Sequence, residues 1–218
     1  MRDLLPPQVA VAVAEPPDFT APLLPAERAA LTESAVTSRR QDFTAGRVCA
    51  RRAMTALGLP PTPVPSAPDR SPVWPTEVVG AITHTRGYCA AAAARATELR
   101  SVGMDAEHHR TLEAGVRRLI CLPEEEERMS RLPTGISWPV VVFSAKETVY
   151  KVWHPVVRQW LDFHDALVDL DPDSGTFTAR IAPARVDAAE VPAPPTTISG
   201  RFVVDGDLVR TAAVLHLP

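Results

Sequence analysis

Residues 141–151 read VVFSAKETVYK, an apolar run that leads directly into two lysines and a glutamate. In an α-helix, residues four apart share a face, so Glu147 and Lys151 point the same way. Upstream, the segment GMDAE follows another apolar run. On a strand, side chains two apart project from one side, which places Asp105 and Glu107 together. Three acids and a lysine on two regular elements predict a site for a metal ion and a phosphorylated ligand.

The acidic pair alone leaves several interpretations open. Two carboxylates about 4 Å apart repel by roughly 4 kcal/mol at an effective dielectric constant near 20, so a buried pair needs a cation or a proton. Oxygen ligands favour Mg²⁺ or Mn²⁺ over zinc. The plain alternative is a solvated pair at a strand end. His108 and His109 follow directly and raise a second alternative, a divalent-metal hydrolase, although consecutive histidines on regular structure cannot both face one metal.

The glutamate of the second motif also has a purely structural interpretation. The segment SAKE matches a capping box, with Ser144 as N-cap and Glu147 at N3. Such a box contributes about 1 kcal/mol to helix stability and needs no function. It does not explain why Lys146 and Lys151 bring two positive charges beside that carboxylate. On residues alone, capping and catalysis both remain possible.

Taken together, GMDAE, FSAKE and the following Tyr150-Lys151 resemble the signature blocks of the Sfp-type 4′-phosphopantetheinyl transferases. A Trp74-Pro75 segment and Thr83-His84-Thr85 lie upstream in the order that this family would place them. The resemblance runs from about Arg39 to Trp160 and is closest to actinobacterial members of this length.

The resemblance implies an α+β fold, made of two similar α/β halves in a pseudo-twofold arrangement with the active site in the cleft between them. We expect an N-terminal half over residues 1–104, with an arginine-rich helix, a hairpin and the side that binds the coenzyme A 3′-phosphate. We expect a C-terminal half over residues 105–218, with the metal and pyrophosphate site, a second helix and antiparallel strands. No internal repeat is visible in the sequence.

The resemblance further implies Mg²⁺-dependent transfer of 4′-phosphopantetheine from coenzyme A, the co-substrate, to a serine of an apo acyl or peptidyl carrier protein, releasing 3′,5′-ADP. The implied metal ligands are Asp105, Glu107 and Glu147, with Mn²⁺ as a possible substitute for Mg²⁺. The implied catalytic residues are Glu147 as general base, Lys151 and Asp105. The implied coenzyme A-binding residues are Arg39, Arg40, Arg47, Thr83, His84, Lys146 and Lys151. A non-catalytic coenzyme A or nucleotide sensor remains an alternative.

One segment departs from the family pattern. A glycine-containing loop, often with a basic residue, usually precedes the family's Pro-x-Trp-Pro. Here residues 66–71, SAPDRS, contain no glycine. We interpret Arg70 as the substitute for the basic contact.

Apolar periodicity and turn residues predict the elements. We expect two long helices, over 38–57 and 144–153, and two shorter ones, over 112–120 and from Pro123 onward. The expected strands cover 78–83, 88–94, 101–105, 166–170, 176–181, 198–204 and 208–215. Proline-rich stretches over 60–75 and 182–195 separate these elements.

Composition excludes several classes of protein. The 218 residues carry a net charge of −3, which predicts no general affinity for nucleic acid. No apolar run approaches the length of a membrane span. Three cysteines without CxxC pairing favour a reducing cytoplasm. We therefore expect a cytoplasmic monomer that binds no nucleic acid and no membrane.

The carrier protein would be acidic, as carrier domains of this kind tend to be. Arg117 and Arg118 lie beside apolar Leu119 and Ile120. We predict that these four residues form a docking patch for the carrier. Whether that carrier serves fatty-acid, polyketide or non-ribosomal peptide synthesis does not follow from the sequence.

Overall fold

The computed structural model describes residues 1–31, 35–182 and 194–218. Most of the proline-rich stretch over 182–195 lies outside these described residues. The chain divides into two compact units, an N-terminal unit of mainly residues 6–102 and a C-terminal unit of mainly residues 103–215. Among the described residues, no helix is both long and apolar enough to cross a membrane.

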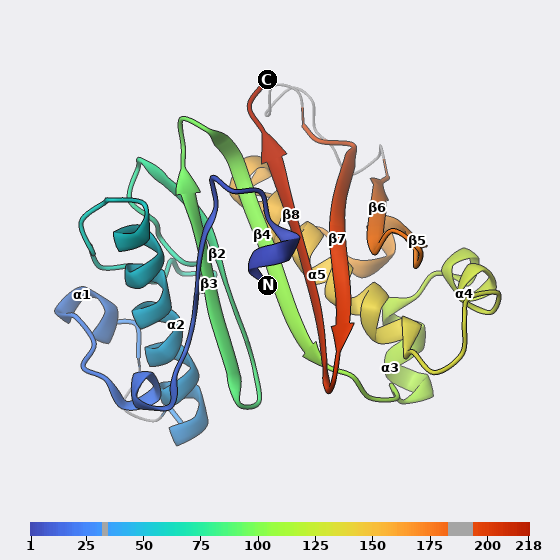
Figure 1. The fold of residues 1–218 in the computed structure, drawn as a ribbon, viewed down its shortest axis with the longest axis horizontal. Helices are drawn as coiled ribbons and strands as arrows, with labels where there is room; N and C mark the ends of the chain where they lie inside the picture. Colours follow the sequence, from blue (N-terminus) through green and yellow to red (C-terminus); the bar gives the residue numbers. More distant parts are fainter. Residues whose placement is uncertain (32–34, 183–193) are drawn as a thin grey trace. The chain divides into compact units, whose positions relative to one another are not determined.

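Both units combine helices with a run of consecutive strands (Figure 1). In chain order they are η1 (Arg2–Leu4), β1 (Ala10–Val13), η2 (Pro16–Thr20), α1 (Pro25–Arg28), α2 (Thr37–Ala56), β2 (Val78–Thr85), β3 (Tyr88–Arg95), β4 (Leu99–His108), α3 (Ala114–Ile120), α4 (Pro123–Met129), α5 (Trp138–Val157), η3 (Phe163–Asp165), β5 (Ala166–Asp171), β6 (Thr176–Ile181), β7 (Thr197–Asp205) and β8 (Leu208–His216).

The strands form two sheets, with the order β1-β3-β2 in the first and β4-β8-β7-β6-β5 in the second. The predicted hairpin around Gly87 is confirmed, because β2 and β3 pair antiparallel from Val78↔Arg95 to Thr85↔Tyr88. All seven predicted strands form, β6 with the predicted bounds. The predicted α+β class is confirmed.

In the N-terminal unit, α2 lies against the three-stranded sheet (Figure 1). Small buried residues such as Ala45, Cys49 and Ala53 repeat every four positions and face the alanine run of β3. Small side chains on both surfaces allow a close approach. At Gly46, an added Cβ would lie only 2.8 Å from the Ile82 Cγ2. The helix backbone at Gly46 therefore packs directly on the Ile82 side chain, which fixes how α2 sits on its sheet.

The same helix ends at Ala56, one residue before the predicted end, and Gly58 follows its C-cap Leu57. This glycine takes φ +72°, a left-handed conformation that costs glycine little. The Leu59 amide then donates to the Met54 carbonyl at 3.0 Å, and the Gly58 amide donates to the Thr55 carbonyl at 2.9 Å. These two bonds form a Schellman motif, which satisfies carbonyls of the last helical turn.

In the C-terminal unit, α5 packs on the five-stranded sheet and is longer than predicted. The prediction that it begins at Ser144 is wrong, because the helix begins at Trp138 with Ser137 as N-cap. Consecutive valines over 140–142 have weak helix propensity, yet all three are buried in the core. Tertiary burial therefore outweighs local propensity here. Helix α5 continues past Pro155 and ends at Arg158, with φ +59°.

Both units contain a short repeat that the sequence analysis missed. The segments LPAE (residues 24–27) and LPEE (residues 122–125) each start a short helix with proline. In each, the glutamate at N3 is buried and accepts the amide of its own leucine, at 3.0 Å for Glu27 and 2.8 Å for Glu125. Each glutamate also accepts one amide from a distant residue, Val64 or Val168. Both then pair with a cation on the long helix of the same unit.

Candidate active site

The predicted acids lie where β4 and α5 cross within the C-terminal unit. At Gly103 on β4, an added Cβ would lie 2.4 Å from the Thr148 carbonyl oxygen and 2.6 Å from the Val152 side chain. The helix can therefore rest directly on the strand only because this residue is glycine. The contact brings Asp105, two residues along β4, beside the helix that carries Glu147.

Asp105 is the centre of this group and is only 4% exposed. Its Oδ1 accepts from the Lys151 Nζ at 2.7 Å, and its Oδ2 accepts from the Ser144 hydroxyl at 2.9 Å. Both oxygens of the carboxylate thus have donors from α5. An ammonium held at hydrogen-bond distance from a nearly buried carboxylate makes a strong, oriented ion pair.

The other two acids are half-buried, and burial raises both of their pKa values. For Glu107, burial and then the nearby Asp105 carboxylate raise the pKa to about 7, while Lys151 lowers it. For Glu147, burial raises the pKa, Lys151 lowers it and Asp105 raises it. The Lys151 ammonium acts on all three carboxylates, and Arg110 also lowers the pKa of Glu107. A further cation would stabilise this group of acids.

The chemistry of this donor set suits a hard divalent ion, because all three side chains offer only carboxylate oxygens. Within the described ranges, however, no three His, Cys, Asp or Glu side chains are grouped closely enough to hold a metal ion. The Lys151 ammonium contacts Asp105. The metal role of Asp105, Glu107 and Glu147 thus stays a prediction, supported by their chemistry and their shared charge.

The structural alternative for Glu147 is wrong. Ser144 lies inside α5 and is fully buried, with its hydroxyl directed at Asp105. It is not an N-cap, so no capping box involves Glu147. This residue sits in the middle of the helix, half-buried next to Lys151 and Asp105, and its position calls for another explanation.

Lys146 does not lie where the pyrophosphate prediction would require. Its side chain is buried, and its Nζ donates to the Ile120 carbonyl at 2.9 Å, to Glu125 Oε2 at 2.8 Å and to the Phe163 carbonyl at 2.8 Å. An ammonium has three N–H donors, and these three acceptors use all of them. We correct the prediction: Lys146 is a structural cation of the core and has no donor left for a phosphate.

Lys146 and Lys151 are the only two lysines in the sequence, beside 21 arginines. Lysine carries a compact charge with three donors, whereas arginine presents a broad planar fork. Three separate acceptors around Lys146 suit a compact ammonium and do not suit a planar guanidinium. In a chain that otherwise uses arginine, both motif lysines occupy positions where a compact ammonium is needed.

His109, the residue that follows β4, does not support the hydrolase alternative. The ring Nε2 of His109 accepts the Ser137 amide at 2.8 Å, and the His109 amide donates to the Asp207 carbonyl at 2.7 Å. This ring nitrogen is used to hold the start of α5 and is not available to a metal.

The predicted coenzyme A-binding arginines and histidine lie in the N-terminal unit. Arg39 is exposed, and Arg40 donates from Nε to the Ala35 carbonyl at 2.9 Å. Thr83 is buried on β2, and the neighbouring His84 is largely exposed. The His84 Nδ1 lies 3.7 Å from Asp42 Oδ2.

Arg47 has mainly structural contacts. It is buried and donates to the Val64 carbonyl at 2.7 Å and to the Ser66 hydroxyl at 2.8 Å. Its guanidinium also lies over the Phe43 ring, 4.1 Å from the centroid. Arg47 thus ties α2 to the start of the loop over residues 66–71.

The loop over residues 66–71 closes without a glycine. It is closed by a bridge between Ser66 and Pro72, and by an Arg70 amide that donates to the Ala67 carbonyl at 2.8 Å. Arg70 takes φ +70°, the left-handed conformation that glycine would normally supply. Its contact with coenzyme A stays a prediction.

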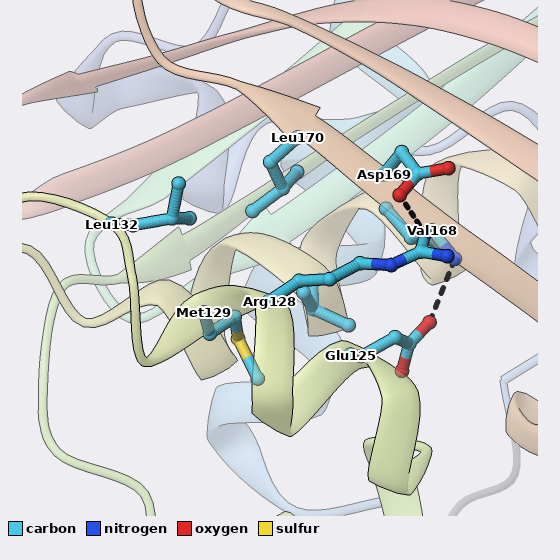
Figure 2. A pocket seen from close by; sticks show the side chains of 8 residues that line it. Glu125, Arg128, Met129, Leu132, Val168, Asp169 and Leu170 are labelled. Atoms are coloured by element: carbon cyan, nitrogen blue, oxygen red, sulfur yellow. Dashed lines mark hydrogen bonds and ion pairs between the residues drawn. The ribbon is translucent and has the colours of Figure 1, made fainter.

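A hollow of about 240 Å³ lies in the C-terminal unit between α4 and β5 (Figure 2). It contains none of the predicted site residues. Its lining residues are Glu125, Arg128, Met129, Leu132, Val142, Val168, Asp169 and Leu170.

Comparison with known proteins identifies the family. Residues 26–94 match the 4′-phosphopantetheinyl transferase N-terminal domain, and residues 101–192 match the 4′-phosphopantetheinyl transferase superfamily. The chain is 41% identical over 204 residues to the 4′-phosphopantetheinyl transferase PptT of Mycobacterium tuberculosis, covering 92% of this chain and 88% of PptT.

Two further relatives cover most of the chain. Svp of Streptomyces mobaraensis is 39% identical over 217 residues, covering 95% of this chain and 85% of Svp. Npt of Nocardia iowensis is 35% identical over 196 residues, covering 86% of this chain and 87% of Npt. Both are 4′-phosphopantetheinyl transferases. The predicted resemblance is confirmed, and this chain belongs to the 4′-phosphopantetheinyl transferase family.

Proposed function

We propose that the protein uses Mg²⁺ to transfer 4′-phosphopantetheine from coenzyme A to a carrier-protein serine, with Asp105, Glu147 and Lys151 as its catalytic residues. The observation that carries this proposal is the crossing of β4 and α5, which gathers an ion-paired aspartate and two half-buried glutamates. Family membership supplies the reaction class, coenzyme A and carrier proteins.

In the proposed step, the serine oxygen attacks the phosphorus that bears the pantetheine arm. A new O–P bond forms as the P–O bond to the nucleotide breaks, and its electron pair leaves on 3′,5′-ADP. Glu147 takes the serine proton. Burial raises the pKa of Glu147, which makes its carboxylate a stronger base than an exposed glutamate.

Lys151 would stabilise the charge that develops on the leaving oxygens, and Asp105 would hold its ammonium in place. A bound Mg²⁺, held by Asp105, Glu107 and Glu147, would neutralise further charge on the pyrophosphate. For the nucleotide end, we keep Arg39, Arg47 and His84 as proposed ligands of the 3′-phosphate. The side chains of Arg39 and His84 are exposed, which supports this role. The Arg47 side chain is buried and supports it less directly.

Mass spectrometry tests the chemistry. We expect the protein, incubated with coenzyme A and Mg²⁺, to add ~340 Da to at least one member of a panel of apo carriers, the gain expected of this covalent group transfer. The gain should disappear when EDTA removes the metal. Unmodified carriers in the presence of bound coenzyme A would instead favour the sensor alternative.

The structure changes the predicted docking patch. On α3, Leu119 is 69% exposed and Val116 is 42% exposed, whereas Ile120 is buried and cannot take part. Arg117 makes a two-point ion pair with Glu126. We therefore propose the exposed face of α3 around Arg118, Val116 and Leu119 as the docking surface for an acidic carrier.

Charge reversal on α3 tests this surface. We expect Arg118→Glu to raise the carrier KM about fivefold, because a charge at an interface rim contributes roughly 1 kcal/mol. The coenzyme A KM and kcat should stay unchanged. Arg131→Glu, two residues after the end of α4, is the matched control because its side chain is also exposed, at 72%. Equal carrier KM values for both variants and the wild type would exclude α3.

A further inference from the structure

Behind Asp105 lies a row of three buried hydroxyls that the reaction scheme does not use. Ser144 and Thr148 are one turn apart on α5, and Thr211 lies on β8. All three side chains are fully buried. A threonine in a helix often bonds back to the carbonyl four residues earlier, but the nearest partner of the Thr148 hydroxyl is the hydroxyl of Thr211, on another element.

The hydroxyls connect in an unbroken line to the carboxylate. The Thr148 and Thr211 hydroxyl oxygens are 2.7 Å apart, and the Thr211 and Ser144 hydroxyl oxygens are 2.9 Å apart. The Ser144 hydroxyl then lies 2.9 Å from Asp105 Oδ2. The Thr211 hydroxyl also lies 2.9 Å from the Ser144 carbonyl oxygen.

The donor and acceptor in each of these hydrogen bonds follow from the carboxylate at the end of the row. Asp105 is ion-paired with Lys151, so its carboxylate only accepts, and Ser144 must donate to it. Both acceptors within reach of the Thr211 hydroxyl on that side belong to Ser144. Thr148 then donates to Thr211. The single Thr211 proton goes to Ser144, whose carbonyl and hydroxyl oxygens both lie 2.9 Å away, so Thr211 braces the residue that donates to Asp105.

From this arrangement we infer that Ser144 and Thr211 are positioning residues for the proposed metal site. Ser144 holds Oδ2 of Asp105, Thr211 holds Ser144, and Oδ1 is left to Lys151. The same orientation would let Asp105 serve as a ligand of the proposed metal. The inference rests on the proposed function, because it assumes that Asp105 binds a divalent ion. Partners behind a ligating carboxylate fix its orientation, and their loss typically weakens metal binding tenfold or more.

A matched pair of substitutions separates positioning from packing. Thr211→Val keeps the shape and removes the hydroxyl, whereas Thr211→Ser keeps the hydroxyl and removes a methyl group. We would measure Mn²⁺ binding to the enzyme–coenzyme A complex from the electron paramagnetic resonance signal of free Mn²⁺. We expect Thr211→Val and Ser144→Ala to raise the Mn²⁺ Kd about tenfold, and Thr211→Ser to stay within about twofold of wild type.

Thr178→Val is the control, because its hydroxyl bonds to Ser199 on the same sheet and has no part in the row. An unchanged Kd for Thr211→Val, or an equal rise for the valine and serine variants, would overturn the positioning role while leaving the proposed function intact. A wild-type enzyme that binds coenzyme A but no Mn²⁺ would overturn both. Thermal unfolding of each variant shows whether a changed Kd reflects a loss of fold.

Discussion

Replacing Lys151 with alanine should lower kcat about a thousandfold and leave the KM for coenzyme A within severalfold of wild type. The Lys151 ammonium pairs with Asp105 and also lowers the pKa values of Glu107 and Glu147. If its charge acts mainly on the leaving oxygens, its removal costs transition-state stabilisation and not ground-state binding. Single preorganised electrostatic contacts of this kind are typically worth 10²–10³ in kcat. Steady-state kinetics with a saturating apo carrier measure the effect.

Lys151→Arg is the matched control for charge. It keeps the positive charge but replaces a compact donor with a planar fork, so we expect turnover between those of wild type and Lys151→Ala. Circular dichroism should show an intact fold in both variants. Thermal unfolding should show a lower Tm for Lys151→Ala than for Lys151→Arg, because alanine leaves the Asp105 side chain, 5% exposed, without its ion-pair partner. Turnover of Lys151→Ala within threefold of wild type would exclude the ammonium from the transition state.

The sequence predicted the regular elements well, because their signals are local. Alternating side chains bounded by glycine and aspartate mark the hairpin at Gly87 and the strand β6, and both form as predicted. The start of α5 depends on burial instead. A run of valines is typical of a strand, and only the core around Trp153 and Phe177 keeps it helical. The four-residue strand β1 was also missed, because its pairing with β3 is set by a distant segment.

The candidate site shows the same difference between local and distant information. The spacing of Asp105, Glu147 and Lys151 predicts that they share faces of their elements, and the structure gathers them. The spacing says nothing of Thr211, which reaches the site from β8 and lies 67 residues beyond Ser144 in the chain. Nor does it separate Lys146 from Lys151, since only the acceptors around each ammonium reveal that the first is structural.

The sequence also did not reveal that Glu125, one of four consecutive glutamates, is the partner of Lys146. Acids at a helix start are usually explained by the helix dipole, and Glu124 and Glu126 fit that explanation. Glu125 differs because it is buried and accepts from the Leu122 amide, the Val168 amide and Lys146. Through this carboxylate, α4, α5 and β5 are held together. The signal that could have revealed it is the LPxE repeat, whose first copy holds Glu27 in the same way.

Breaking this pair should give the largest loss of stability of any substitution considered for this protein. We expect Lys146→Met to lower the free energy of unfolding by about 3–5 kcal/mol, because it leaves the Glu125 carboxylate buried without a counter-charge. The Lys146 side chain is 2% exposed and that of Glu125 is 0% exposed, so water cannot solvate the remaining charge. Chemical denaturation, followed by tryptophan fluorescence, measures the change.

The double variant Lys146→Met with Glu125→Leu removes both charges and should recover part of the loss, since an apolar pair avoids the desolvation cost. Recovery will be incomplete because the Leu122 and Val168 amides lose their acceptor. Arg51→Met is the matched control in the N-terminal unit. Its side chain is 15% exposed, so water can reach the vacated position and the loss should be smaller. A loss below 1 kcal/mol for Lys146→Met would mean that the ammonium is not a structural cation, and would return Lys146 to the candidates for phosphate binding.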